Sequence, residues 1–367
     1  ADGAERKVRN KSMHLRRILC PALAALAAPA PSVSSAPSER TASFESCARP
    51  STEAATVGGQ AVMEGVMMRN GPVYALAVRA SDGDIVVERR RWYTLGGGAV
   101  SGKPFVRGFP LLVETLVNGI RALNRSAEFV APDEADKPGD VQLALTLVVS
   151  LAMAAGLFVA APHLMVLGMK TLGLGGDLER LSFHLWDGFF KFAIFLGYIA
   201  AISLVPDIRR VFQYHGAEHK VIRAFEQGGE VSARSAAACS RLHPRCGTTF
   251  MLFVLSVAIV LHAVLVPFFL WLWQPQSAFA RHAGTLVFKV GLMVPISAVA
   301  YEIIRYAARL GSSLWGRLLR GPGLMLQLLT TREPDREQLE VALVALREAV
   351  SPEAAARLQT PAYTVLE

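Results

Sequence analysis

Four long runs of hydrophobic residues, almost free of charge, follow one another in the middle and second half of the chain. Each is compatible with the ~20 residues that an α-helix needs to cross the hydrocarbon core of a bilayer. We therefore expect four membrane spans, near residues 143–169, 188–206, 248–273 and 284–304. The alternative is a very hydrophobic soluble bundle, which uncharged runs of this length disfavour.

The region before the first run has two different patterns. The segments Ala-Leu-Ala-Val-Arg (75–79) and Ile-Val-Val-Glu-Arg (85–89) flank the sequence Ser-Asp-Gly-Asp, which is a strong signal for a β-hairpin. From Phe105 to Phe129, leucine and isoleucine recur near helical spacing while arginines occupy the other side. This second pattern predicts an amphipathic helix that either lies along a membrane surface or packs as a core helix of the soluble unit.

These patterns together predict a mainly α-helical, polytopic membrane protein with a small N-terminal β-hairpin unit and amphipathic helices. We expect a targeting or disordered segment at 1–56, the hairpin and amphipathic helix at 57–132, a membrane domain at 133–310 with a polar loop at 207–247, and a C-terminal helical tail at 311–367. The stretch 13–40 is rich in alanine, proline and serine and has a single acidic residue, which indicates a transit peptide. The apolar residues 18–30 leave a secretory signal peptide as the alternative.

Charge adds an orientation to this picture. The formal net charge is +8, but basic and aromatic residues are not interleaved as nucleic-acid binding would favour, so we expect the lipid bilayer and no nucleic acid as a partner. Seven Lys and Arg residues lie in the loop 207–247, whereas the other two loops between spans carry three in total. By the positive-inside rule, both mature termini and the central loop are expected on the cytoplasm-like side, which agrees with an even number of spans.

The central loop carries the first candidate chemistry. Pro206 suits the first turn of a helix and Gly228-Gly229 suits its end. On that helix His215 and His219 are four residues apart and share a face, so their imidazoles can bind one metal ion. With Glu218 they form the H-x-x-E-H order, in which the glutamate is a general base toward water on the metal.

A second cluster lies on the same loop. Cys239, His243 and Cys246 stand at spacings that are common in zinc sites, and the four cysteines of the chain are too few for a disulfide scaffold. Glu302 ends the fourth span at the same membrane face and needs a partner there, which is Arg305 or the metal site. We therefore expect a divalent metal, zinc above all, and the following site residues: Glu218 as the catalytic residue, His215, His219, His243 and Cys246 as metal ligands, and Glu302, Cys239 and Glu64 as weaker candidates.

Four segments of the chain resemble, in order, the bacterial YqhQ-like membrane proteins: Gly58–Arg69, Tyr214–Lys220, Ser240–Thr248 and Leu329–Pro334. The resemblance covers roughly residues 57–350, and the family, whose function is unknown, is commonly labelled a predicted metal-dependent enzyme. It implies a membrane location and supports the same ligand set with Glu218, but it supplies no substrate. Bacterial relatives begin near the first segment, so the resemblance also implies that 1–56 is an added targeting segment. The destination it implies is a chloroplast membrane, with both mature termini in the stroma.

Two functions of different classes follow. The leading hypothesis is a membrane-embedded, zinc-dependent hydrolase-like enzyme that acts on a peptide or a lipid headgroup. The alternative is a non-enzymatic scaffold or assembly factor, with a structural metal or none, that binds a protein partner. A transporter is disfavoured, because the spans carry few charges and show no inverted repeat. Four helices often need partners to shield polar residues, which is compatible with a homo-oligomer, but the sequence does not fix the oligomeric state.

Overall fold

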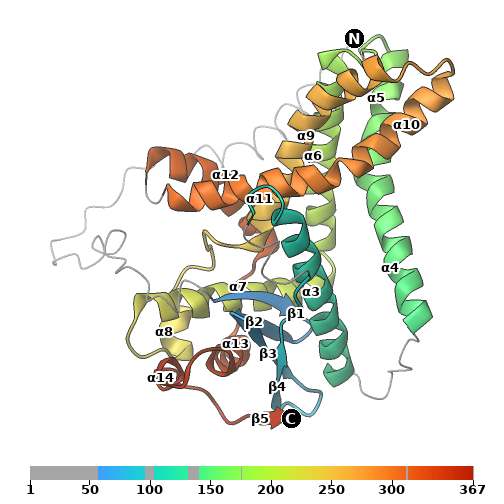
Figure 1. Ribbon diagram of the computed structural model, residues 1–367. Coiled ribbons are helices and arrows are strands. Elements are labelled where there is room, and N and C mark those ends of the chain that lie inside the picture. Colours follow the sequence, from blue (N-terminus) through green and yellow to red (C-terminus); the bar gives the residue numbers. More distant parts are fainter. Residues whose placement is uncertain (1–56, 96–102, 131–139, 175, 311–312, 367) are drawn as a thin grey trace, which may run out of the picture. The chain divides into compact units, whose positions relative to one another are not determined.

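The computed structural model describes residues 57–95, 103–130, 140–174, 176–310 and 313–366 (Figure 1). The expected transit peptide at 1–56 lies outside these residues. The described part is mainly helical, with a small β-sheet near its N-terminal end, as the sequence predicted.

The sheet has five strands in chain order: β1 (Gly58–Val62), β2 (Gly65–Asn70), β3 (Val73–Arg79), β4 (Ile85–Arg91) and β5 (Thr364–Leu366). The first four pair antiparallel, and the predicted hairpin is β3–β4, with Gly83 at a φ of +93° in its turn. The C-terminal strand β5 pairs parallel with β4, which the sequence analysis did not anticipate. The two ends of the described chain therefore share one sheet.

Both faces of this sheet are covered by helices. α3 (Gly108–Val130) packs on one face, and α7 (Pro206–Gln227) and α13 (Arg336–Ala349) pack in the core on the other. Alternating residues of β2 therefore enter different cores: Met68 packs with α7 and α13, while Met67 packs with Ala122 of α3. A strand that is buried on both faces reads as a continuous apolar run, which explains the methionine-rich segment before the hairpin.

The amphipathic helix α3 packs on the sheet, as one of the two expected roles requires, and its position at a membrane surface stays a prediction. Its buried face consists of small and polar residues: Gly108, Glu114, Asn118, Gly119, Ala122 and Ser126. Gln60 of β1 lies so close to Gly119 that an added Cβ would be 2.4 Å from its Oε1. Leu116 and Leu123 are exposed on the opposite side. The helix thus packs on the sheet through its polar face and leaves a row of leucines uncovered.

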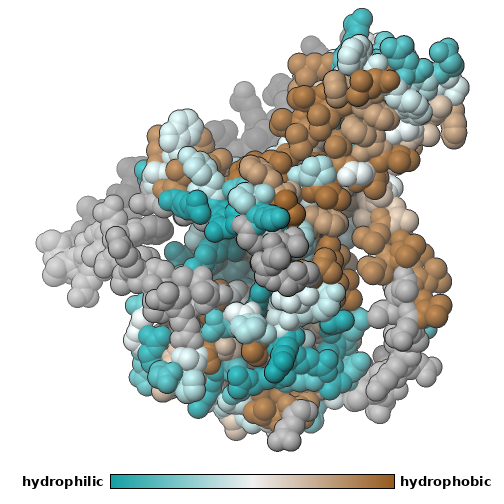
Figure 2. All heavy atoms as spheres, in the orientation of Figure 1, coloured by the Kyte–Doolittle hydropathy of each residue, from teal (hydrophilic) through white to brown (hydrophobic). Residues whose placement is uncertain are grey.

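Three helical segments are long and apolar enough to cross a membrane. The first, Leu145–Thr171, runs through α4 (Asp140–Ala155), a π-helical segment (Gly156–Ala160) and α5 (Ala161–Thr171); the others are α6 (Leu181–Ile202) and α9 (Gly247–Leu272). A fourth span exists if α10 (Ala278–Gly291) and α11 (Met293–Arg309), bent by 40° at Leu292, count as one. Hydrophobic residues gather over α9 and α10 in Figure 2, while the region of the sheet is mostly hydrophilic.

Two of the expected spans differ from the observed helices. The second was expected to begin near residue 188, but α6 begins at Leu181 and includes Asp187. It can do so because Asp187 is buried in ion pairs with Lys191 and Lys289. The fourth was expected to be continuous, but the helix breaks shortly before Pro295. Proline has no backbone N–H to bond to the preceding turn, so it is tolerated in the first turn of α11 and not in the middle of a continuous helix.

The remaining helices are α8 (Ala233–Ala237), α12 (Leu314–Thr330) and α14 (Pro352–Ala355). The helix predicted from Pro206 is confirmed as α7, and it ends at two glycines with φ near +80°. α12 contacts α9, where Gly323 lies against Thr249. The end of α12 and the start of α9 therefore lie close to each other, beside α7.

Candidate metal centre

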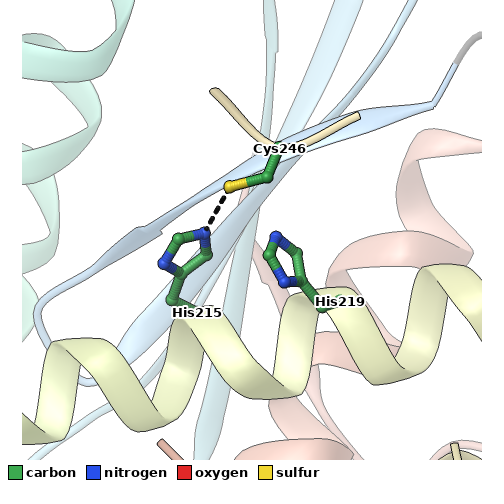
Figure 3. Close-up of side chains that lie close together, drawn as sticks. All are labelled: His215, His219 and Cys246. Atoms are coloured by element: carbon green, nitrogen blue, oxygen red, sulfur yellow. Dashed lines mark hydrogen bonds between the residues drawn. The ribbon is translucent and has the colours of Figure 1, made fainter. Parts of the chain in front are cut away.

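The two histidines of the H-x-x-E-H segment lie one turn apart on α7 and point to the same side (Figure 3). Their ring centroids are 4.4 Å apart. Both face Cys246, which is the N-cap residue of α9, and the Nε2 atom of His215 lies 3.2 Å from the Cys246 Sγ. One ligand atom from each of His215, His219 and Cys246 lies within 4.8 Å of the other two, so this group could hold a metal ion.

Backbone carbonyls fix how the two imidazoles are presented. The Nδ1 atom of His215 is 2.9 Å from the Thr330 oxygen, and that of His219 is 2.6 Å from the Arg241 oxygen. A carbonyl only accepts, so each Nδ1 carries the proton and donates it. Each neutral ring therefore keeps its lone pair on Nε2, the nitrogen that faces the cysteine. Histidines that bind metals in proteins are held in the same way by a carbonyl or carboxylate behind the ring.

Burial favours the neutral state that this arrangement requires. His219 is buried, and burial lowers the pKa of its imidazole. Cys246 is half-buried and caps α9, where the Thr248 N–H donates to its Sγ at 3.4 Å. The site therefore offers two imidazole nitrogens and one sulfur.

This donor set fits zinc better than a hard cation. Imidazole and thiolate suit zinc, while magnesium and calcium prefer oxygen ligands. Catalytic zinc sites have three protein ligands and one open position, whereas structural zinc sites have four protein ligands. Among the described residues the group contains three, which matches the first pattern.

Glu218 lies outside this group. Its side chain packs against Gly59 of β1, where an added Cβ would come within 2.9 Å of the Glu218 Cδ and Oε1. The residue is 5% exposed, and burial raises the pKa of its carboxyl to about 7, although a hydrogen bond from the Gly59 backbone partly opposes this. Gly59 is therefore required for the position of Glu218. The catalytic role of Glu218 stays a prediction.

His243 lies beside the group but is held by other partners. Its ring centroid is 5.6 Å from that of His219, and its Nε2 is 3.3 Å from Glu226 Oε1. Its backbone N–H and C=O bond to the side chain of Gln327, at 2.8 and 2.9 Å. The structure thus does not bring His243 into the group of three, and its ligand role also stays a prediction.

The weaker candidates lie elsewhere. Glu302 pairs with Arg107, just before α3, at 2.7 Å, whereas Arg305 and the metal site were the two expected partners. Cys239 is buried against Gln227 and Ser235, with burial raising the pKa of its thiol. Glu64 binds Arg210 and accepts a hydrogen bond from Tyr214. In the structure all three are engaged away from the His-His-Cys group.

Sequence reasoning missed the residues that position the site, although most of them lie in the four segments quoted above. Thr330 and Arg241 act through backbone oxygens, and no side-chain pattern reveals that. Gly216 is needed because a Cβ there would lie 2.0 Å from the Arg332 oxygen. The four segments converge at this site: the first reaches Glu218, the second carries the histidines, the third Cys246 and the fourth Thr330.

The fold and the site together define a polytopic membrane protein with a candidate metal centre beside the start of a span. The chain belongs to the family described as "Protein of unknown function (DUF1385)", which matches residues 103–352. It is similar to the "Uncharacterized protein YqhQ" of Bacillus subtilis (strain 168), with 33% identity over 84% of this chain and 97% of the relative. No solved structure matches the chain.

Proposed function

We propose that this protein is a membrane-embedded, zinc-dependent hydrolase-like enzyme. The observation that carries the proposal is the pair of carbonyl bonds that turn both Nε2 lone pairs toward Cys246. His215, His219 and Cys246 would hold the ion. When bound, zinc supplies Lewis acidity and makes water a nucleophile near neutral pH.

Glu218 would accept the proton of the attacking water. It follows His215 by three residues and precedes His219 by one, so it lies beside both ligands along α7. Gly59 leaves room for its carboxyl and donates a backbone hydrogen bond to it. The carboxyl is thereby held in one orientation, and no arginine or lysine among the described residues forms an ion pair with it. This leaves an oxygen able to take a proton and pass it to the leaving group.

The surroundings of the site support a substrate at the lipid boundary. Cys246 precedes the apolar helix α9, and the carbonyl that holds His215 ends α12. Along α12 an exposed apolar row recurs at helical spacing: Leu314, Leu318, Met325 and Leu328, with Trp315 beside it. Such a helix is suited to lie in a membrane interface. A lipid headgroup or a membrane-bound peptide would therefore be presented to the site.

One observation favours the alternative function. The Glu218 carboxyl packs against Gly59 and is not among the three residues that could share an ion. A non-enzymatic scaffold would use the same contact to join α7 to the sheet, with the metal in a structural role. The two functions make different predictions for Glu218, since a scaffold needs only its shape.

The metal is tested first. The full chain, purified in lipid nanodiscs, is analysed for zinc, iron and manganese. We expect about one zinc per chain, lost in His215→Ala and in Cys246→Ser. Cys239→Ser is the matched control, because Cys239 contacts Gln227 and Ser235 instead. Wild-type protein without stoichiometric metal would end the proposal.

The catalytic role is tested with Glu218→Gln, which keeps the shape and the ability to accept from Gly59. An enzyme should retain its zinc and thermal stability in this variant and lose hydrolysis of membrane-presented esters and peptides, by roughly 10²–10⁴-fold if the residue is the general base. Unchanged hydrolysis in the variant would show that Glu218 is not the general base, and a wild-type protein that hydrolyses none of these substrates would favour the scaffold.

A further inference from the structure

The membrane helices contain a buried charged cluster that the proposed hydrolase does not use. Asp187 and Lys191 lie on α6 and Lys289 lies on α10, and their side chains are at most 2% exposed. Both ammonium groups contact the same carboxylate oxygen: Lys191 donates to Asp187 Oδ2, and the Lys289 Nζ lies 3.1 Å from it. We call these three residues the lysine centre.

Charge in the lysine centre does not balance. Among the described residues Asp187 is the one carboxylate that pairs with either lysine, so the fully ionised centre carries +1. An uncompensated charge inside a bilayer is costly, and ionisable groups there usually belong to a functional path. Loss of a single proton makes the centre neutral.

A chain of histidines connects the lysine centre to the surface. The Lys289 Nζ lies 3.4 Å from Nδ1 of the buried His163, whose Nε2 lies 3.0 Å from Nδ1 of His282. His282 is partly exposed, near the start of α10. The second lysine of the centre contacts another histidine: the Lys191 Nζ lies 3.1 Å from Nδ1 of His262.

The donor properties of lysine set the direction of this chain. An ammonium group only donates, so Nδ1 of His163 accepts from Lys289 and the neutral ring carries its proton on Nε2. That N–H then donates to Nδ1 of His282, whose own proton is on Nε2. Every bond from Lys289 outward is therefore aligned for transfer toward the surface.

We propose that the lysine centre is an intramembrane proton-binding site that releases one proton through His163 and His282. The Lys289 Nζ–H bond breaks as His163 Nδ1–H forms; His163 Nε2–H breaks as His282 Nδ1–H forms; and His282 Nε2–H breaks to give the proton to water. Both imidazoles start and finish neutral. The charge of the centre changes from +1 to zero.

The unpaired atoms around the lysine centre support a proton over an anion as its ligand. Within the described part of the chain, Asp187 Oδ1 and Nδ1 of His184 have no hydrogen-bond partner, and the His184 Nε2 donates to the Leu178 oxygen at 2.9 Å. Both unpaired atoms are acceptors. Around the lysine centre, Nε2 of His262 is the one unpaired donor among the described residues. A bound anion would add hydrogen-bond acceptors to a site where two buried acceptors already lack a donor.

This site is distinct from the metal centre. His262 is 16 residues along α9 from Cys246, which corresponds to about 24 Å of helix. His282 follows the C-terminal end of α9, while Cys246 caps its N-terminal end. The proton-binding site therefore exchanges with the end of the span that is remote from the candidate zinc ligands.

Proton release is the test. The full chain in nanodiscs is taken from about pH 5 to about pH 9, below the ordinary lysine range, and released protons are counted with an indicator dye. Lys289→Met is combined with His163→Phe, because a His163 freed of its lysine could titrate instead. We expect this double variant to release one proton per chain fewer than wild type, while Lys170→Met, at an exposed lysine of α5, matches wild type. Equal release by wild type and the double variant would overturn the proposal.

The route is tested separately with His282→Phe, which alters only the partly exposed end and avoids a folding defect in the centre. Stopped-flow release should deliver the same number of protons roughly 10²-fold more slowly. An unchanged rate would show that protons leave another way. If release requires chloride or phosphate in the buffer, the centre is an anion site and the proposal is wrong.

Discussion

Gly216 offers the sharpest test of how the candidate metal centre is held. It lies between the ligand His215 and the rest of the H-x-x-E-H segment, where α7 meets the backbone that follows α12. A Cβ added at this glycine would be 2.0 Å from the Arg332 carbonyl oxygen, and real Cβ contacts hardly ever fall below 3.0 Å. The Gly216→Ala protein must therefore open this contact by at least 1.0 Å.

The opening has a calculable effect on the ligand. His215 donates to the Thr330 oxygen at 2.9 Å, two residues before Arg332. If Thr330 moves with Arg332, the distance between the His215 Nδ1 and the Thr330 oxygen becomes about 3.9 Å, which is too long for a hydrogen bond. His215 then loses the contact that fixes its tautomer, and loss of such a contact typically lowers metal affinity 10–100-fold. Overpacking adds a stability loss of about 1–3 kcal/mol.

The assay is zinc competition with a chelator, together with thermal unfolding, on full-length protein in nanodiscs. Gly197→Ala is the matched control, because that helical glycine in α6 has no neighbour within 4 Å of an added Cβ. We expect weaker zinc binding and a lower Tm for Gly216→Ala, and wild-type values for Gly197→Ala. Wild-type zinc affinity in Gly216→Ala would show that the Thr330 contact does not hold the ligand.

Three further predictions concern residues around the site. Gln327→Ala leaves the His243 backbone N–H and C=O unpaired, so we expect the free energy of unfolding to fall by roughly 2–5 kcal/mol in denaturant titrations, with the exposed Gln274→Ala as control. Arg107→Met breaks the pair with Glu302 and should lower Tm without changing zinc content; loss of zinc would contradict the position found for Glu302. Burial raises the pKa of Cys239, so its thiolate fraction near neutral pH is small. We therefore expect iodoacetamide to alkylate Cys239 more slowly than a free cysteine peptide, as measured by mass spectrometry. The rate should rise only as the pH passes the usual thiol pKa.

Local pattern was sufficient to predict much of the fold. The length of the uncharged apolar runs predicts the membrane helices, and the Ser-Asp-Gly-Asp turn predicts β3–β4, because both signals are local in sequence. The start of α6 could not be predicted in this way. Asp187 looks like a boundary charge until Lys289, 102 residues later, is known to neutralise it.

The sequence predicted which residues could bind a metal, but not which of them contact one another in the fold. The i, i+4 spacing places His215 and His219 on one face, and the structure brings the predicted ligand Cys246 close to both. The pattern could not tell Cys246 from His243, because the choice depends on where α9 begins relative to α7. Glu302 shows the same limit: its nearest basic residue in sequence is Arg305, but its partner Arg107 comes from a segment 195 residues away.

The candidate metal centre joins parts of the chain that have different reasons to fold. His215 and His219 belong to α7, which packs on the sheet, while Cys246 starts an apolar helix and Thr330 ends another that packs on it. α7 buries its apolar face with the sheet and α13, whereas α9 and α12 pack on each other. An ion bound by all three ligands would therefore add its binding free energy to the joint between them, since metal binding in such sites is coupled to folding. Chelation should then loosen the contact between α7 and the start of α9 before it unfolds either, with hydrogen exchange rising first at residues 240–248 and 329–334 while β2 and β3 stay protected.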